Sequence, residues 1–343
     1  MKKILAIALC LIMVLSVVAC GTKEADYTLG MGVVVSTDSS ATGNAQVDAT
    51  IAAVVTDAEG KIVLCRIDVA QNKMNVTDGA VDTAATFKTK MEKGTEYGMA
   101  GKVDNDGNGV MLEWDEQAKA FEAYVVGKTV AEVEAIKTQE ANGHQIAVDT
   151  ALLEAGCSMQ ITDFIAAVVK ACKDDQSMAF KAVAGSFTLG VAAKTTAASS
   201  TAATAEAEGS VQMYSDIACA VVADGKVIAT LNDAIQPKIT IDAAGEIVEK
   251  SFKATKRELK EGYNMAAYGS DNDGDGRVLE WYVQSAEFSK YAVGKTATEI
   301  ATLETAEVNA HFVSADAALI SAGCTMQITG IMAVVAQAAN NAR

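Results

Sequence analysis

One stretch of the sequence occurs twice, and this repeat constrains the fold more than any other feature. Asp104–Trp114 reads DNDGNGVMLEW, and Asp271–Trp281 reads DNDGDGRVLEW. From residue 104 to residue 172 the chain aligns without a gap with residues 271–339, at a shift of 167 residues. Upstream the shift falls to 166 and then 165 residues, as small loop insertions would produce. A period this long indicates two whole domains, because solenoid repeats span only about 20–50 residues.

The repeat divides the chain into two domains of similar length. We expect the first at residues 27–173 and the second at residues 186–343, joined by a linker at 174–185. In each domain, segments rich in Val and Ile flank an Asp/Gly turn, which predicts a β-hairpin at 49–68 and at 217–231. Helix-favouring segments follow. The sequence therefore predicts an α+β fold of two tandem homologous domains, each an antiparallel sheet covered by helices.

The positions of several helices follow from their capping residues. Thr129 with Glu132, and Thr296 with Glu299, form a capping-box pattern. Apolar helices are expected from Thr162 and Thr329, with threonine as the N-cap. Longer helices are predicted at 86–96, 113–125, 251–262 and 280–292, and extended segments at 151–161 and 318–328.

The N-terminus has the pattern of an export signal. Two lysines precede an apolar run that ends at residue 18, which is too short to span a bilayer and predicts a signal peptide at residues 1–19. The segment LSVVAC, which ends at Cys20, resembles the lipobox of bacterial lipoproteins. The resemblance implies lipid on Cys20, a tether at residues 20–26 and a location on the outer face of the cytoplasmic membrane. A plain signal peptide with an incidental cysteine is the alternative.

Charge and cysteine content exclude several classes of protein. The net charge is −16, and without Lys2 and Lys3 it becomes −18, from 26 basic and 44 acidic residues. Such an acidic body repels phosphate backbones, so we expect no nucleic-acid partner. Five cysteines remain beyond Cys20, an odd number without close pairs, which argues against a disulfide framework. Neither a CxxC pair nor paired histidines indicate a zinc site.

The repeated acidic stretch resembles the first half of a calcium-binding loop. We call residues 104–114 the first acidic loop and residues 271–281 the second acidic loop. Alternating oxygen ligands on a glycine-bent turn converge on one point, which suits Ca²⁺. The alternative is an exposed turn rich in Asp and Gly. The candidate ligands are Asp104, Asp106, Asn108 and Glu113 in the first loop, and Asp271, Asp273, Asp275 and Glu280 in the second.

A second repeated motif, AGCSMQIT at 155–162 and AGCTMQIT at 322–329, precedes the last apolar helix of each domain. Small residues before a helix start leave backbone N–H groups for an anion. The motif resembles that of FMN-binding domains in bacterial flavin-carrying lipoproteins and sodium-pumping quinone reductase subunits. The resemblance implies FMN attached at Ser158 and Thr325. The alternative is a strand that leads into a core helix.

Three functions follow from these features. The first is a non-enzymatic surface lipoprotein whose two domains, stabilised by calcium, bind a small molecule or a protein. The second is an FMN-carrying electron-transfer lipoprotein. The third is a hydrolase that uses His144 or His311 with the aspartate five residues later as a general base. No nucleophile motif accompanies the histidines, so the sequence favours binding over catalysis.

Overall fold

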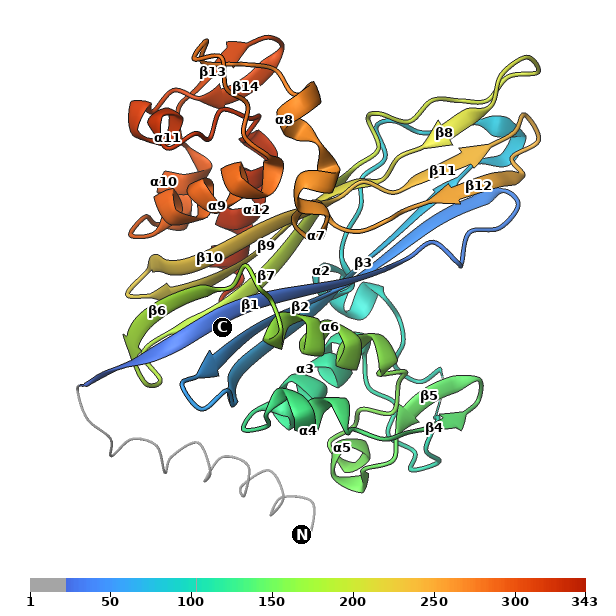
Figure 1. Ribbon diagram of the computed structural model, residues 1–343. Coiled ribbons are helices and arrows are strands. Elements are labelled where there is room, and N and C mark those ends of the chain that lie inside the picture. Colours follow the sequence, from blue (N-terminus) through green and yellow to red (C-terminus); the bar gives the residue numbers. More distant parts are fainter. Residues whose placement is uncertain (1–22, 103) are drawn as a thin grey trace.

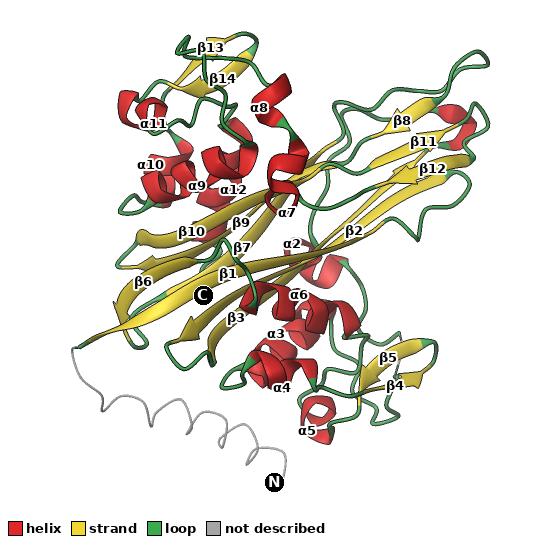
Figure 2. Cartoon of the chain, viewed as in Figure 1, coloured by secondary structure: helices red, strands yellow, loops and turns green. Residues whose placement is uncertain are grey.

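The computed structural model describes residues 23–102 and 104–343, and it shows an α+β fold (Figure 1). Two antiparallel sheets pack face to face, and helices cover the outer face of each sheet (Figure 2). The predicted signal peptide and Cys20 lie outside the described residues. Among the helices within the described ranges, none combines the length and apolarity that crossing a membrane requires.

The first sheet has the strand order β3-β2-β1-β6 and the second has the order β10-β9-β7. The first contains β1 (Glu24–Ser36), β2 (Asn44–Asp57), β3 (Ile62–Asn75) and β6 (Met178–Val183). The second contains β7 (Thr188–Thr196), β9 (Tyr214–Ala223) and β10 (Lys226–Ile235). Strands β2 and β3, like β9 and β10, form the predicted hairpins, which are confirmed.

Strand β6 lies within the segment expected to be a linker. It pairs antiparallel with β1, and Phe180 stands opposite Tyr27. The rings of these two residues stack with 5.6 Å between centroids, and Phe187 packs edge-on against both. The connection between the halves is therefore part of the first sheet.

A smaller sheet extends the second half only. It has the order β12-β11-β8, from β8 (Gly209–Val211), β11 (Lys238–Ile241) and β12 (Ile247–Ser251). In the first half β3 continues without a break, whereas Pro237 separates β10 from β11. Proline has no N–H to donate to a strand ladder, so the long strand is interrupted there.

Two long helices cover each sheet. These are α3 (Trp114–Val125) and α6 (Thr162–Cys172) on the first, and α9 (Trp281–Ala292) and α12 (Thr329–Asn340) on the second. Gly30 lets α6 approach β1 closely, because a Cβ there would lie 2.0 Å from the Ala171 carbonyl oxygen. Gly190 has the same relation to Ala338 on α12. Glycine is required at both strand positions.

Within the described residues, this layering produces three apolar cores. Two lie between a sheet and its helices, around Trp114 and Phe121 in the first half and around Trp281 and Phe288 in the second. The third lies between the sheets and joins side chains of both halves. Strand β7 also lies against β3, and β6 against β10, so the sandwich is closed along both edges.

Short elements complete each half around the long helices. The first half contains α2 (Lys90–Lys93), α4 (Val130–Glu134), β4 (Thr138–Ala141), β5 (His144–Ala147) and α5 (Thr150–Glu154). The second half contains α7 (Lys256–Leu259), α8 (Met265–Tyr268), α10 (Ala297–Ala301), β13 (Thr305–Val308), β14 (His311–Ser314) and α11 (Ala317–Ser321). Corresponding elements thus follow one another in the same order, whereas the duplication itself stays a prediction.

Some predictions of local structure are confirmed and others are wrong. The capping boxes at Thr129 and Thr296 are confirmed. The extended segment predicted at 151–161, and its counterpart at 318–328, is wrong over its first residues, because Asp149 and Asp316 cap the short helices α5 and α11. Helix α2 has only four residues of the predicted 86–96, because Gly94 takes a φ of 47° there.

The predicted threonine caps are also wrong. Helices α6 and α12 do begin at Thr162 and Thr329, but Ile161 and Ile328 are the N-caps, and neither cap has a side-chain hydrogen bond. The reason lies in tertiary contacts. Both isoleucine side chains are buried in the core, and the Ile161 N–H donates to the carbonyl of Gln145 in β5.

Candidate ligand-binding pockets

Each half contains a cavity between the outer face of its sheet and its helices. The cavity in the first half, which we call the first pocket, has a volume of about 480 Å³. The cavity in the second half, the second pocket, has about 350 Å³. Nine identical residue pairs line the two: Gln71/Gln236, Lys90/Lys256, Tyr97/Tyr263, Met99/Met265, Asn105/Asn272, Trp114/Trp281, His144/His311, Met159/Met326 and Gln160/Gln327.

A buried carboxyl group holds each pocket lysine in place. Lys90 and Lys256 are the first residues of α2 and α7. Asp68 accepts a hydrogen bond from the Met91 N–H at 3.1 Å, and Asp233 accepts one from the Arg257 N–H at 3.0 Å. Burial raises the pKa of both carboxyl groups to about 6. These helices are thereby fixed to β3 and β10.

The lysine ammonium groups lie over aromatic rings. Lys256 Nζ is 4.5 Å from the ring centroid of Tyr263 and 5.4 Å from that of Trp281. Lys90 Nζ is 4.8 Å from the Tyr97 centroid and 5.5 Å from that of Trp114. Ring faces attract cations, so each ring pair orients its lysine. Burial lowers the pKa of Lys256 to about 8.

Each pocket also contains a carboxylate, but a different element supplies it. In the second pocket it is Asp216 on β9, and in the first it is Asp163 on α6. Their sequence counterparts are Thr50 and Gly330. Gly330 makes room for Asp216, because a Cβ there would lie 2.1 Å from Asp216 Oδ2. Burial raises the pKa of Asp216 to about 6, and burial followed by the charge of Asp48 raises that of Asp163.

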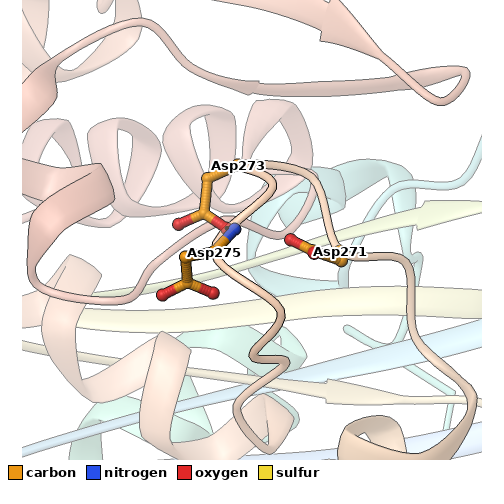
Figure 3. Close-up of side chains that lie close together, drawn as sticks. All are labelled: Asp271, Asp273 and Asp275. Carbon is orange, nitrogen blue, oxygen red and sulfur yellow. Dashed lines mark hydrogen bonds between the residues drawn. The ribbon is translucent and has the colours of Figure 1, made fainter.

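The second acidic loop brings three carboxylates together (Figure 3). One carboxylate oxygen from each of Asp271, Asp273 and Asp275 lies within 4.8 Å of the others. Asp271 accepts hydrogen bonds from the N–H groups of Gly274 at 2.8 Å and Gly276 at 3.0 Å, and these bonds lower its pKa. Hydrogen bonds within the loop thus shape it so that the three side chains converge.

The first acidic loop has the same internal bonds with one carboxylate fewer. Asp104 accepts hydrogen bonds from Gly107 and Gly109 at 2.8 and 2.9 Å. At the third position Asn108 replaces the aspartate, and its Nδ2 donates to Asp106 Oδ2 at 2.7 Å. This loop therefore offers a cation less negative charge than the second loop does.

The two glutamates expected at the tenth loop position have other partners. Glu113 accepts a hydrogen bond from the Met99 N–H at 2.9 Å, and Glu280 accepts one from the Met265 N–H at 2.8 Å. Glu113 is also the N-cap of α3. Both glutamates fasten the end of the acidic loop to a methionine that lines a pocket.

The second residue of each acidic loop belongs to the pocket wall. Asn105 Nδ2 donates to the Ser158 carbonyl at 2.9 Å, and Asn272 Nδ2 donates to the Thr325 carbonyl at 2.8 Å. Asn309, in the turn between β13 and β14, donates to Asn272 Oδ1 at 3.1 Å. The acidic loop, the hairpin and the AGC motif therefore meet at one wall of each pocket.

The proposed FMN positions lie behind this wall. Ser158 and Thr325 are buried. The N–H groups of Ser158 and Met159 both donate to Gln117 Oε1, at 3.0 and 2.9 Å, and Gln284 accepts the equivalent pair in the second half. Two backbone donors of each motif are thus already used within the protein. The FMN hypothesis stays a prediction.

The histidines line the pockets, whereas the aspartates expected beside them have structural roles. Asp149 caps α5 and accepts the Tyr124 hydroxyl at 2.7 Å. Asp316 caps α11 and accepts the Tyr291 hydroxyl at 2.5 Å. This arrangement gives no support to a general base built from each histidine and its following aspartate.

The pocket lysines, tyrosines and methionines were not predicted as site residues. No ligand-binding motif marks Lys90 or Lys256, because each lies between the threonine and the glutamate of a capping box (Thr89/Glu92 and Thr255/Glu258), a pattern that indicates only the start of a helix. The available signal was the identity of the two lysines at equivalent positions of the repeat. Comparisons of the chain with models of protein families, with curated proteins and with solved structures find no match.

Proposed function

We propose that the protein is a membrane-anchored extracytoplasmic lipoprotein that binds small molecules in two pockets. The nine identical residue pairs around the two cavities carry this proposal. Aromatic walls with a few convergent polar groups are typical of ligand sites. Packing alone does not require Lys, His, Asn and Gln to face the same cavity twice, so a ligand explains their presence better.

The remaining parts of the proposal have separate support. The membrane anchor is supported by the lipobox-like sequence at Cys20. A stabilising role for calcium is supported by the convergence of Asp271, Asp273 and Asp275. Since Asn272 in the same loop contacts the AGC motif, a bound ion would also hold the pocket wall. Binding is favoured over catalysis because no nucleophile motif accompanies the histidines.

Tryptophan fluorescence tests the binding function. The chain has two tryptophans, and Trp114 lines the first pocket while Trp281 lines the second. In the variant Trp281→Phe, emission reports the first pocket alone, and in Trp114→Phe it reports the second. We expect at least one compound of a metabolite library to shift the emission of a pocket tryptophan. The same compound should raise the melting temperature, because a ligand at one hundred times its Kd stabilises the native state by about 2.7 kcal/mol.

The control is a substitution at the pocket lysine. Lys90→Met or Lys256→Met should abolish the emission shift of its own pocket and leave the other unchanged. If no compound of a broad library affects either tryptophan or the melting temperature, the binding function is refuted.

A further inference from the structure

Among the positions at which the two pockets differ, one bears directly on how their charged side chains are connected. Asp48 on β2 and Tyr214 on β9 are equivalent, because Thr50 faces Val69 in the first sheet as Asp216 faces Ala234 in the second. Asp48 lies two residues before Thr50, and Tyr214 lies two residues before Asp216. At this position the first half has a carboxylate and the second half has a phenol.

In the second pocket the Tyr214 hydroxyl joins the two charged groups. Lys256 Nζ donates to the hydroxyl oxygen at 3.2 Å, and the hydroxyl donates to Asp216 Oδ1 at 3.3 Å. The Tyr214 ring also lies 4.7 Å from Lys256 Nζ. Lys256 is only 7% exposed. A side chain of the protein itself thus bridges the ammonium and the carboxylate.

In the first pocket the corresponding charges are left apart. Lys90 is half-buried, and among the described residues it has neither an ion pair nor a hydrogen-bond acceptor for Nζ. Asp48 Oδ2 accepts a hydrogen bond from Gln46 Nε2 at 2.7 Å. Asp48 Oδ1 is buried and accepts none from any described residue. The carboxylate of Asp163 lines the same cavity.

An unbridged cation and an unpartnered carboxylate oxygen in one cavity favour a particular ligand chemistry. A buried acceptor without a donor costs free energy, and so does a partly buried cation without an anion. A simple anion would serve only Lys90, and a simple cation would serve only the carboxylates. A ligand that has both charges satisfies both groups at once.

We propose that the first pocket binds a small zwitterion, with the ligand carboxylate on Lys90 and the ligand ammonium at Asp48 and Asp163, and that Tyr214 fills the equivalent place in the second pocket. This inference rests on the proposed binding function and names its ligand class. The larger volume of the first pocket, about 480 Å³ against about 350 Å³, agrees with it. The nine shared residues then line a zwitterion site in the first half and, in the second half, a pocket whose own charges are already bridged and whose remaining volume of about 350 Å³ suits a different ligand.

Calorimetric titration of the full-length chain in mild detergent tests the ligand class. The probes are glycine, 4-aminobutanoate and 6-aminohexanoate, which differ in the separation of their charges. Butanoate and butylamine each carry one charge and serve as controls. We expect at least one aminoalkanoate to bind with one site per chain, and the singly charged controls to bind at least tenfold more weakly.

Matched variants locate the site. Lys90→Met and Asp48→Asn should each weaken binding tenfold or more, whereas Lys256→Met, the same change in the other pocket, should leave the affinity within twofold. Asp48→Tyr should abolish binding by filling the first pocket, and Tyr214→Asp should raise the stoichiometry from one to two. Circular dichroism establishes that each variant is folded, and Trp114 emission in a Trp281→Phe background gives a second measure of occupancy.

The possible failures are distinguishable. Equal binding of butanoate or butylamine, or loss of binding with Lys256→Met but not with Lys90→Met, would overturn the zwitterion inference. If no aminoalkanoate binds but another class of compound shifts the emission of Trp114, this inference fails and the proposed binding function stands. If neither pocket responds to any compound, both fail.

Discussion

At the scale of single residues, the second pocket depends on the steric fit between positions 216 and 330. Asp216 occupies space that only a glycine at 330 leaves free. The first half has the opposite arrangement, with Thr50 on the strand and Asp163 on the helix. At this matched pair of positions each half thus keeps one carboxylate, although the element that supplies it differs; Asp48 is a further carboxylate of the first pocket.

We therefore expect Gly330→Asp to destabilise the protein by about 1–3 kcal/mol, because it forces a second carboxylate onto Asp216. Adding Asp216→Thr, which reproduces the arrangement of the first half, should recover most of this loss. Urea unfolding of both single variants and the double variant measures the coupling between the two positions. If the two effects simply add, the packing conflict between these residues is not the cause.

The buried carboxyl groups of Asp68 and Asp233 predict how stability depends on pH. Their pKa of about 6 in the folded protein lies above the ordinary value of 3.8, because burial disfavours the charged form. The stability that they contribute is therefore full below pH 4 and is lost as the pH rises through 6. We expect the free energy of unfolding to increase between pH 7 and pH 5 by about 1 kcal/mol for each group, and the rest of the effect to appear only below pH 5.

Thermal melts between pH 5 and pH 8 measure this effect. The double variant Asp68→Asn with Asp233→Asn keeps an oxygen that can accept the hydrogen bonds but has no charge to lose. Its melting temperature should vary less over this interval. An unchanged slope would assign the pH dependence to other groups, of which Asp216 is the first candidate because its pKa is also about 6.

At the scale of elements, the acidic loops show what local spacing predicts and what it omits. The spacing of Asp271, Asp273 and Asp275 predicts that their side chains converge, and they do. The same spacing suggested Glu280 as a ligand. That role stays a prediction, and the Glu280 carboxylate accepts the N–H groups of Met265 and Ala266, some 15 residues earlier in the chain. A competing partner of that kind cannot be inferred from the loop sequence.

Calcium should stabilise the protein mainly through the second loop. Three carboxylates converge there, against two in the first loop, and affinity for Ca²⁺ grows with ligand charge. We expect millimolar calcium to raise the melting temperature and Asp271→Ala to abolish most of that rise. The control is Asp275→Asn, which introduces the asparagine found at the equivalent position 108 of the first loop. It should weaken calcium binding and keep the hydrogen bonds that Gly274 and Gly276 donate to Asp271. No calcium-dependent shift in the unaltered protein would refute the site.

The helix ends also separate features set by local sequence from features set by tertiary contacts. The capping boxes at Thr129 and Thr296 are local, since the threonine and the glutamate three residues later bond to each other through backbone and side chain, and the sequence predicted them. The start of α6 depends instead on the burial of Ile161, which involves residues from other elements. The pockets were missed for a related reason: Lys90 and Trp114 are brought together only when α2 and α3 pack on the same sheet.

At the scale of the whole molecule, the two halves depend on each other. The inner faces of both sheets form one apolar core, in which Leu29 and Met31 of β1 and Leu189 and Val191 of β7 take part. Arg257 and Asp174, which are both buried, also form an ion pair between the second half and the segment that follows α6. Either half alone would expose one complete apolar sheet face to water.

We therefore expect residues 23–184 and residues 185–343, produced separately, to be aggregated or to bind hydrophobic dyes without a fixed tertiary structure. Mixed in equal amounts during refolding, they should restore the near-ultraviolet circular dichroism of the intact protein. As a control, cleavage at a protease site inserted in the exposed turn at 184–186 should leave the native fragments associated. Two monomeric halves with well-dispersed NMR spectra would contradict this expectation.

The strand β6 has a consequence for how a ligand can be captured. Many two-lobed binding proteins close like a clamshell, which requires a connector that bends freely between the lobes. Here the connector is itself a sheet strand, and the lobes are fused through a common interior. Entry and release must then be governed by the small elements around each cavity, such as the β4–β5 hairpin, so that one site can fill without reorienting the other.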